Sequence, residues 1–104
     1  MGLIEEMRQA FKAVRYEYTL HAVDQSILRH ITRKELLEAI ENGEVIEDYP
    51  DDKHGPSCLV YGMTRAGRHL HVQCSYPQHR PKVKIITVYE PNSEEWIDYR
   101  MRRR

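Results

Sequence analysis

The sequence has no long apolar run, only two cysteines and no net charge. A helix that crosses a bilayer needs about 20 predominantly apolar residues, so we expect no membrane partner. The opening residues lack the basic and then apolar pattern of a signal peptide, which predicts a cytoplasmic location. A chain of 104 residues is too short for two cores of useful size, so residues 1–104 should form a single domain.

The two cysteines, Cys58 and Cys74, fall within predicted strands. In a reducing compartment their thiols stay free. Cys74 also belongs to a spacing with His69, His71 and His79 that contains the ligands zinc prefers. However, Cys74 has the opposite strand parity to His69 and His71, so its thiol points to the other face unless a bulge or an intermolecular site intervenes. We therefore expect no metal and no other cofactor.

Charge is segregated along the chain although the total is zero. Residues 35–52 carry eight acidic and no basic side chains, whereas residues 53–89 carry six basic and no acidic ones. Four arginines then close the chain at Arg100, Arg102, Arg103 and Arg104. A basic sheet and tail could therefore face an anion, although a solvated surface opposite an acidic helix explains the same pattern.

Residues 1–43 predict a helical part. Apolar residues recur at helical spacing over residues 2–14, and a second helix is placed at residues 20–29. Thr32 and Glu35 have the spacing of a capping box, in which each side chain satisfies the other residue's backbone amide at a helix start. This motif predicts a third helix over residues 33–41.

The periodicity changes in residues 44–90, where strand-forming and turn-forming segments alternate. Strands are predicted at residues 45–49, 58–64, 68–76 and 82–89. Residues 91–104 are interpreted as a turn with a short helical end, in which Trp96 folds back on the core, followed by a basic tail. The expected fold is α+β, with N-terminal helices packed on one face of a mainly antiparallel sheet of three to four strands. The residues expected in its core are Leu36, Leu37, Ile40, Leu70, Val72, Ile86 and Val88.

Several segments carry a resemblance to a known family, among them residues 19–22 (TLHA), 43–52 (GEVIEDYPDD), 55–59 (GPSCL), 70–72 (LHV) and 85–91 (IITVYEP). Through them the chain resembles the bacterial and archaeal family called domain of unknown function 4258. The family pattern is in turn similar to that of RelE-type and BrnT-type ribonuclease toxins, which place helices before a curved antiparallel sheet. The chain departs from those toxins in being neutral overall and in lacking their usual excess of lysine and arginine.

Metal-free RNA cleavage needs a base for the 2′-hydroxyl, an acid for the leaving oxygen and a cation for the charge on phosphorus. The residues that offer these types are His21, Arg29, His71, Thr87 and Tyr89. His71 lies between Leu70 and Val72, so its side chain points away from the layer that buries those two. The strand pattern does not decide whether His71 meets Tyr89. Structural roles are an open alternative for His21, as a helix histidine bonded to a carbonyl, and for Tyr89, as a core ring.

These observations lead to two hypotheses. The first is a RelE-like, metal-independent endoribonuclease or RNA-binding toxin of a toxin-antitoxin pair, whose partners are RNA and a small antitoxin protein. The second is a non-catalytic protein-interaction domain with a basic sheet surface, which packs against an acidic partner or as a homodimer. A short, acidic or DNA-binding reading frame beside the gene favours the first hypothesis.

Overall fold

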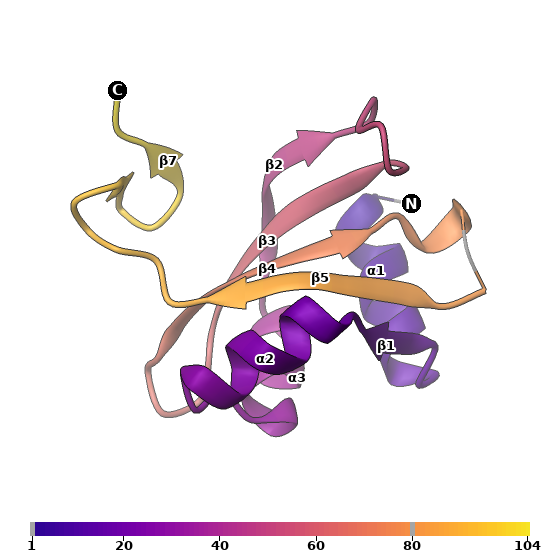
Figure 1. The fold of residues 1–104 in the computed structure, drawn as a ribbon, viewed down its shortest axis with the longest axis horizontal. Coiled ribbons are helices and arrows are strands. Elements are labelled where there is room, and N and C mark those ends of the chain that lie inside the picture. The colour runs from indigo at the N-terminus through magenta and orange to yellow at the C-terminus, as the bar shows by residue number, and fades with distance from the viewer. Residues whose placement is uncertain (1, 80) are drawn as a thin grey trace.

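A computed structural model describes residues 2–79 and 81–104 (Figure 1). The helices are α1 (Leu3–Lys12), α2 (Leu20–Leu28) and α3 (Arg33–Glu41). The strands are β1 (Tyr16–Tyr18), β2 (Glu44–Tyr49), β3 (Ser57–Met63), β4 (His69–Ser75), β5 (Val83–Tyr89), β6 (Trp96–Ile97) and β7 (Met101–Arg102), with a 3₁₀ turn at Pro77–His79. The three predicted helices and the four predicted strands are confirmed with small differences at their ends.

The main sheet corrects the expected architecture, because it has five strands in the order β1-β5-β4-β3-β2 and is mixed. Strands β2 to β5 are antiparallel neighbours, as expected, whereas β1 pairs parallel with β5. The three residues of β1 are too few to show a periodicity, and the pairing with the distant β5 is what makes them a strand.

The C-terminal region is the second correction. Instead of a turn with a short helical end and a tail, residues 96–102 form a two-stranded antiparallel sheet of β6 and β7, here named the C-terminal hairpin. Trp96 is buried, as expected, and starts the first strand of this hairpin.

Side-chain caps fix where α2 and α3 begin. The capping box of Thr32 and Glu35 is present at α3. At α2, Thr19 Oγ1 accepts a hydrogen bond from the amide of Ala22 and donates to the carbonyl of Ile85, which joins the helix start to β5. Within the described ranges, no helix is both long and apolar enough to cross a membrane.

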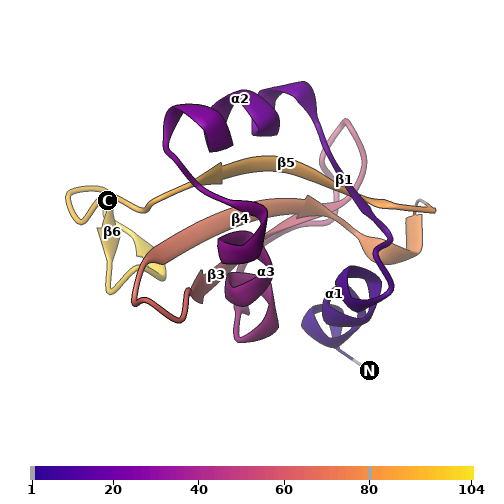
Figure 2. The same ribbon diagram turned by 90° about the horizontal axis from the view of Figure 1, so that it is seen from below.

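Figure 2 shows α1 and α3 on one side of the sheet and α2 running along β5. Beyond the end of β1, the side chain of Gln25 in α2 accepts a hydrogen bond from the amide of Val88 at 3.1 Å. The helix thereby supplies a hydrogen-bond partner to part of the β5 edge that the short β1 does not pair with. The position of α2 is therefore set by the sheet edge and not only by apolar packing.

The core lies between the helices and one face of the sheet. Close contact between α3 and β3 depends on Gly62, because a Cβ atom there would lie 1.9 Å from the carbonyl oxygen of Ala39. Five of the expected core residues are fully buried, namely Leu36, Ile40, Leu70, Val72 and Val88. Leu37 and Ile86 are only partly buried. The pairing of β4 with β5 shifts register beside Ile86, which takes this side chain out of the core pattern.

Leu36→Ala should lower the free energy of unfolding by about 2–5 kcal/mol, because the Leu36 side chain is fully buried and its removal leaves a cavity. Leu28→Ala is the matched control, since Leu28 is 75% exposed and its truncation should change stability by about 0.5 kcal/mol or less. Urea denaturation of both variants measures the difference. Equal effects at the two positions would contradict the core described above.

Candidate functional site

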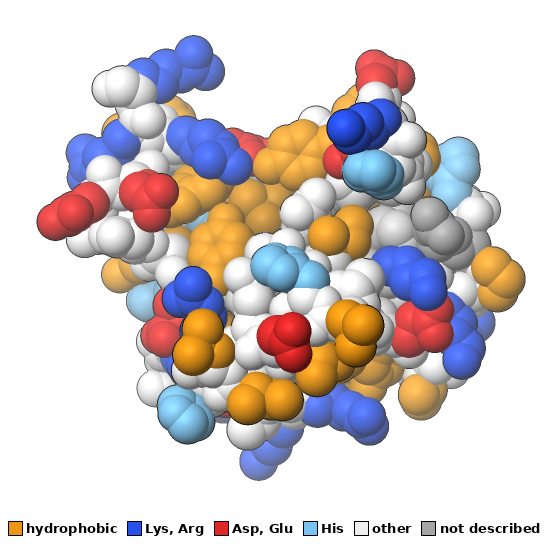
Figure 3. Space-filling model, viewed as in Figure 1, with side chains coloured by type: hydrophobic (Ala, Val, Ile, Leu, Met, Phe, Trp, Pro, Cys, Tyr) orange, Lys and Arg blue, Asp and Glu red, His pale blue; other side chains and the backbone are white. Residues whose placement is uncertain are grey.

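The face of the sheet opposite α1 and α3 carries three of the side chains singled out by the sequence. This outer face is formed by Ser57, Leu59 and Tyr61 of β3, His69, His71, Gln73 and Ser75 of β4, and Thr87 and Tyr89 of β5. The strand registers place His71 opposite Tyr89 and Gln73 opposite Thr87. In Figure 3 the surface is hollowed between the C-terminal hairpin on the left and the β2–β3 turn on the right, with hydrophobic side chains on its floor.

His71 and Tyr89 meet in a hydrogen-bonded pair. The distance from His71 Nδ1 to the Tyr89 hydroxyl is 3.1 Å, and that from Nε2 to the backbone carbonyl oxygen of Tyr99 is 2.6 Å. Because a carbonyl only accepts, the Nε2 atom carries the proton and Nδ1 accepts from the Tyr89 hydroxyl. Both ring nitrogens of His71 are therefore occupied by the protein itself.

The C-terminal hairpin covers His71. The Trp96 ring meets His71 edge-on with centroids 4.5 Å apart, and the Tyr99 ring stacks on His69 at 3.8 Å. Asp98 and Tyr99 turn the hairpin with φ values of 56° and 64°, in the left-handed region that larger side chains seldom adopt. His71 is consequently 0% exposed, so it does not reach solvent as a general base must.

Two arginines of the hairpin are neutralised by the acidic segment. Arg100 pairs with Glu44 at 2.8 Å, and Arg102 pairs with Glu47 at 2.9 Å. The Arg102 guanidinium also lies over the Trp96 ring, 4.7 Å from its centroid. Two of the four C-terminal arginines are therefore paired with carboxylates of residues 35–52 within the molecule.

Burial and hydrogen bonding shift the pKa values of His71, Tyr89 and Glu47. Burial lowers the pKa of His71, and the carbonyl of Tyr99 only partly offsets this effect. Burial also raises the pKa of Tyr89 to about 12. At Glu47, burial acts to raise the pKa, but hydrogen bonds from Arg102 and Tyr49 outweigh it and hold the pKa below its usual value. His71 and Tyr89 are thus uncharged, and Glu47 is charged, near neutral pH.

Beside the buried pair, the outer face opens into a cleft of about 350 Å³. Its lining comes from four parts of the chain and comprises Thr19, Asp52, His54, Gly55, Gln73, Ser75, Lys84 and Ile86. Thr87 is not among the lining residues, but it lies opposite Gln73, which is. The sequence analysis missed His54 and Lys84 as site residues, although both belong to the basic segment over residues 53–89.

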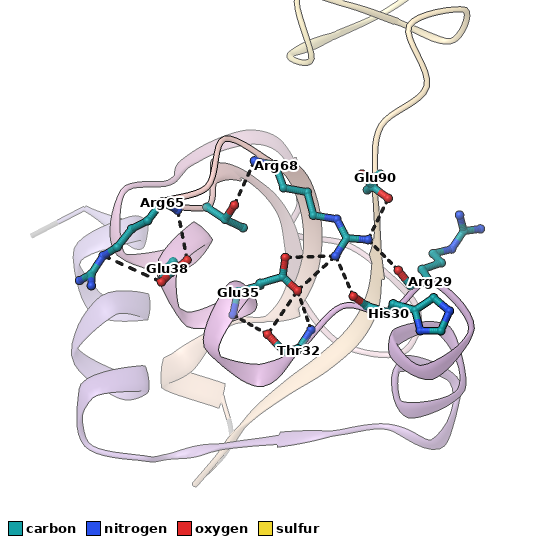
Figure 4. Close-up of polar contacts among 9 residues, drawn as sticks. Arg29, His30, Thr32, Glu35, Glu38, Arg65, Arg68 and Glu90 are labelled. Carbon is teal, nitrogen blue, oxygen red and sulfur yellow. Dashed lines mark hydrogen bonds and ion pairs between the residues drawn. The ribbon is translucent and has the colours of Figure 1, made fainter.

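His21 and Arg29 do not join the buried pair. Both side chains are exposed on α2 or at its end, and no hydrogen bond or ion pair connects them to His71 or Tyr89 in the part of the chain that the structure describes. In Figure 4 the Arg29 side chain extends away from the neighbouring ion-pair cluster. Of the five residues expected to converge, the structure therefore brings together His71 and Tyr89, with Thr87 beside them.

Arg68, a basic residue that the sequence did not single out, occupies the centre of that cluster (Figure 4). Its guanidinium donates to the carbonyls of Arg29 and His30 at 2.6 and 2.7 Å. It also pairs with Glu35 at 3.1 Å and with Glu90 at 2.9 Å. Arg68 therefore holds the structure together and does not contribute a free cation to the surface.

The cysteine and the two histidines of β4 point to opposite faces of the sheet, as their strand parity predicted. Cys74 is fully buried in the core, whereas His69 and His71 lie on the outer face. Both cysteines are free, and burial raises the pKa of Cys58 to about 12. Over residues 2–79 and 81–104, no three His, Cys, Asp or Glu side chains gather where a metal ion could be held.

The mixed sheet, the capped α2 and the polar cleft define a small α+β protein with its candidate site on the outer face. The sequence model of the family described as domain of unknown function (DUF4258) matches residues 18–90, so the chain belongs to this family. The matched range contains α2, α3 and strands β2 to β5 and ends before the C-terminal hairpin. No curated protein and no solved structure matches the chain.

His71→Gln should reduce the pH dependence of stability. A folded-state pKa below the usual value of about 6.5 means that the unfolded chain takes up the proton first as pH falls. The stability contributed by neutral His71 is therefore complete above about pH 6.5 and is lost as pH falls toward the folded-state pKa. At pH 7.5 the variant should lose about 1–3 kcal/mol, because an amide does not hold the Tyr89 and Tyr99 hydrogen bonds together in the geometry of the imidazole ring.

Urea denaturation between pH 7.5 and 5.5 measures this effect, and the difference between wild type and His71→Gln should shrink as pH falls. His79→Gln is the control, since His79 is exposed and should leave the slope unchanged. Parallel slopes for wild type and His71→Gln would show that His71 is not held neutral.

Proposed function

We propose that this protein is a RelE-like, metal-independent endoribonuclease or RNA-binding protein that engages single-stranded RNA on the outer face of its sheet. The observation that carries the proposal is the open cleft on the outer face, where His54 and Lys84 line the same hollow. These groups, a histidine for proton transfer and a cation for phosphate, are the types that RNA cleavage without a metal needs.

The chemistry requires no group beyond RNA itself. A base removes the proton of a ribose 2′-hydroxyl, and the oxygen attacks the adjacent phosphorus. The bond from phosphorus to the 5′-oxygen of the next nucleotide breaks, and that oxygen takes up a proton. The products are a 2′,3′-cyclic phosphate and a free 5′-hydroxyl. In this proposal His54 transfers protons and Lys84 stabilises the charge on phosphorus.

The surroundings of the cleft also suit RNA. The half-buried rings of Tyr49 and Tyr89 offer apolar faces on which bases can stack. Arg103 and Arg104 at the end of the C-terminal hairpin are exposed and add positive charge to its rim. His71 and Tyr89 then have a positioning role, because their hydrogen bonds hold the hairpin that carries these arginines.

The toxin hypothesis adds a small antitoxin protein as partner. A different observation favours the interaction-domain hypothesis, with a partner protein or a second copy of the chain. Leu20, Ile27 and Leu28 project from α2 and are 83%, 68% and 75% exposed. An apolar helix face of this kind is typical of a surface that another protein covers. In Figure 3 hydrophobic side chains gather over α2, below the hollow.

Purified protein should cleave a labelled single-stranded RNA in the presence of EDTA and leave 2′,3′-cyclic phosphate ends. His54→Ala should slow cleavage by about 10²- to 10⁴-fold, because a positioned acid-base group contributes that much. His79→Ala is the control, since His79 is an exposed histidine that does not line the cleft. Circular dichroism establishes that each variant is folded.

A second measurement follows growth and RNA integrity after induced expression of wild type and His54→Ala in a bacterial host. Wild type should arrest growth and degrade RNA, and His54→Ala should do neither. Intact RNA and normal growth with folded wild-type protein, together with no RNA cleavage in vitro, would favour the interaction-domain hypothesis.

A further inference from the structure

The cleft on the outer face holds side chains that a bare phosphodiester backbone does not need. We propose that it is a subsite for one guanine nucleotide, with Asp52 and Gln73 on the edge of the base and Lys84 on the phosphate. This inference rests on the proposed RNA function and adds to it the identity of the base that enters the cleft.

The size and walls of the cleft suit a single planar ring system. Its volume of about 350 Å³ lies at the lower end of the range of about 300–1,000 Å³ found for small-molecule sites. The side chain of Ile86, displaced from the core by the register shift of β5, supplies an apolar wall. His54 lines the same cleft, where the proposed proton transfer needs its imidazole at the ribose and not against the base.

Asp52 determines which base is preferred. Its Oδ1 atom accepts a hydrogen bond from the backbone amide of His54 at 2.9 Å, which fixes the carboxylate within the β2–β3 turn. A carboxylate only accepts hydrogen bonds, so it favours a base edge with adjacent donors. Guanine presents an N1 hydrogen and a 2-amino group side by side, whereas uracil presents one N3 hydrogen between two carbonyl oxygens that a carboxylate repels.

Gln73 is held in place on the floor of the cleft. Its Nε2 atom donates to Ser57 Oγ at 3.2 Å, so the amide has a defined orientation between β3 and β5. An amide carries both a donor and an acceptor and complements a base edge that the carboxylate alone does not cover. Because a carboxylate repels phosphate, the side of the cleft that carries Asp52 and Gln73 suits a base and not the phosphate backbone.

Lys84 provides the attraction for phosphate. Its ammonium pairs with Glu17 on β1, and the two side chains are 37% and 41% exposed. An ion pair this open to solvent is weak, so a phosphate can approach the ammonium from solvent. The amide of Lys84 donates to Ser75 Oγ at 2.8 Å, which anchors the backbone below the side chain.

Isothermal titration of the full chain with GMP, UMP and guanosine tests this assignment. Wild type should bind GMP more tightly than UMP, and more tightly than guanosine, which lacks the phosphate. Asp52→Asn keeps the acceptor in the turn but replaces the carboxylate, and should weaken GMP binding by about 5- to 150-fold and remove the preference over UMP. Asp51→Asn is the matched control, since Asp51 is exposed, adjacent in sequence and outside the cleft lining.

Lys84→Ala should weaken GMP and UMP by a similar factor and leave guanosine unaffected, whereas Lys82→Ala, outside the cleft, should change none of them. Equal wild-type affinities for GMP and UMP, or an unchanged preference in Asp52→Asn, would overturn the subsite. RNA cleavage without guanine preference would also overturn it while supporting the ribonuclease. GMP binding that depends on Asp52, without any RNA cleavage, would support the subsite and overturn the ribonuclease.

Discussion

The guanidinium of Arg68 is the constraint on which the arrangement of the helices and the sheet depends. It lies immediately before β4, yet its hydrogen bonds reach the carbonyls at the end of α2, the carboxylate of Glu35 at the start of α3, and Glu90 after β5. Helix ends leave carbonyls without partners, and the tight connection between α2 and α3 has His30 at a φ of 54°. Charge-assisted bonds from one side chain hold this connection against the end of the sheet.

The placement of α2 in turn shapes the outer face. Thr19 caps the helix and also bonds the carbonyl of Ile85, so the helix start becomes a wall of the cleft. At its other end α2 is fixed by Arg68, and in its middle by the hydrogen bond from Val88 to Gln25. Because α2 is fixed at three points, its exposed apolar side chains are presented on a rigid support. The cleft and this apolar surface share one helix, so a protein that binds α2 would lie close to the cleft.

The sequence predicted most of the elements because their signals are local. The capping box of Thr32 and Glu35, the helical periodicity of residues 2–14 and the strand alternation around His71 each require only nearby residues. It could not predict β1, whose three residues become a strand only through pairing with β5, nor the displacement of Ile86, which follows from a register shift between two strands.

The candidate site was also predictable from the sequence only in part. Strand parity correctly separated His71 from Cys74, and the meeting of His71 with Tyr89 depended on a register that the pattern left open. The burial of His71 was unforeseeable, because it results from a hairpin whose anchor is a backbone carbonyl. His54 of the β2–β3 turn and Lys84 of β5 line one cleft only through the three-dimensional arrangement of these segments, which composition does not encode.

The bond from His71 to the carbonyl of Tyr99 has a consequence for how this protein can change over generations. Every amino acid carries a backbone carbonyl, so the anchor of the C-terminal hairpin does not depend on which residue stands at position 99. The backbone there must still adopt a positive φ, which glycine and asparagine tolerate best. A substitution of the side chain at position 99 can therefore leave this hydrogen bond in place. The family match ends at residue 90 and does not include the hairpin.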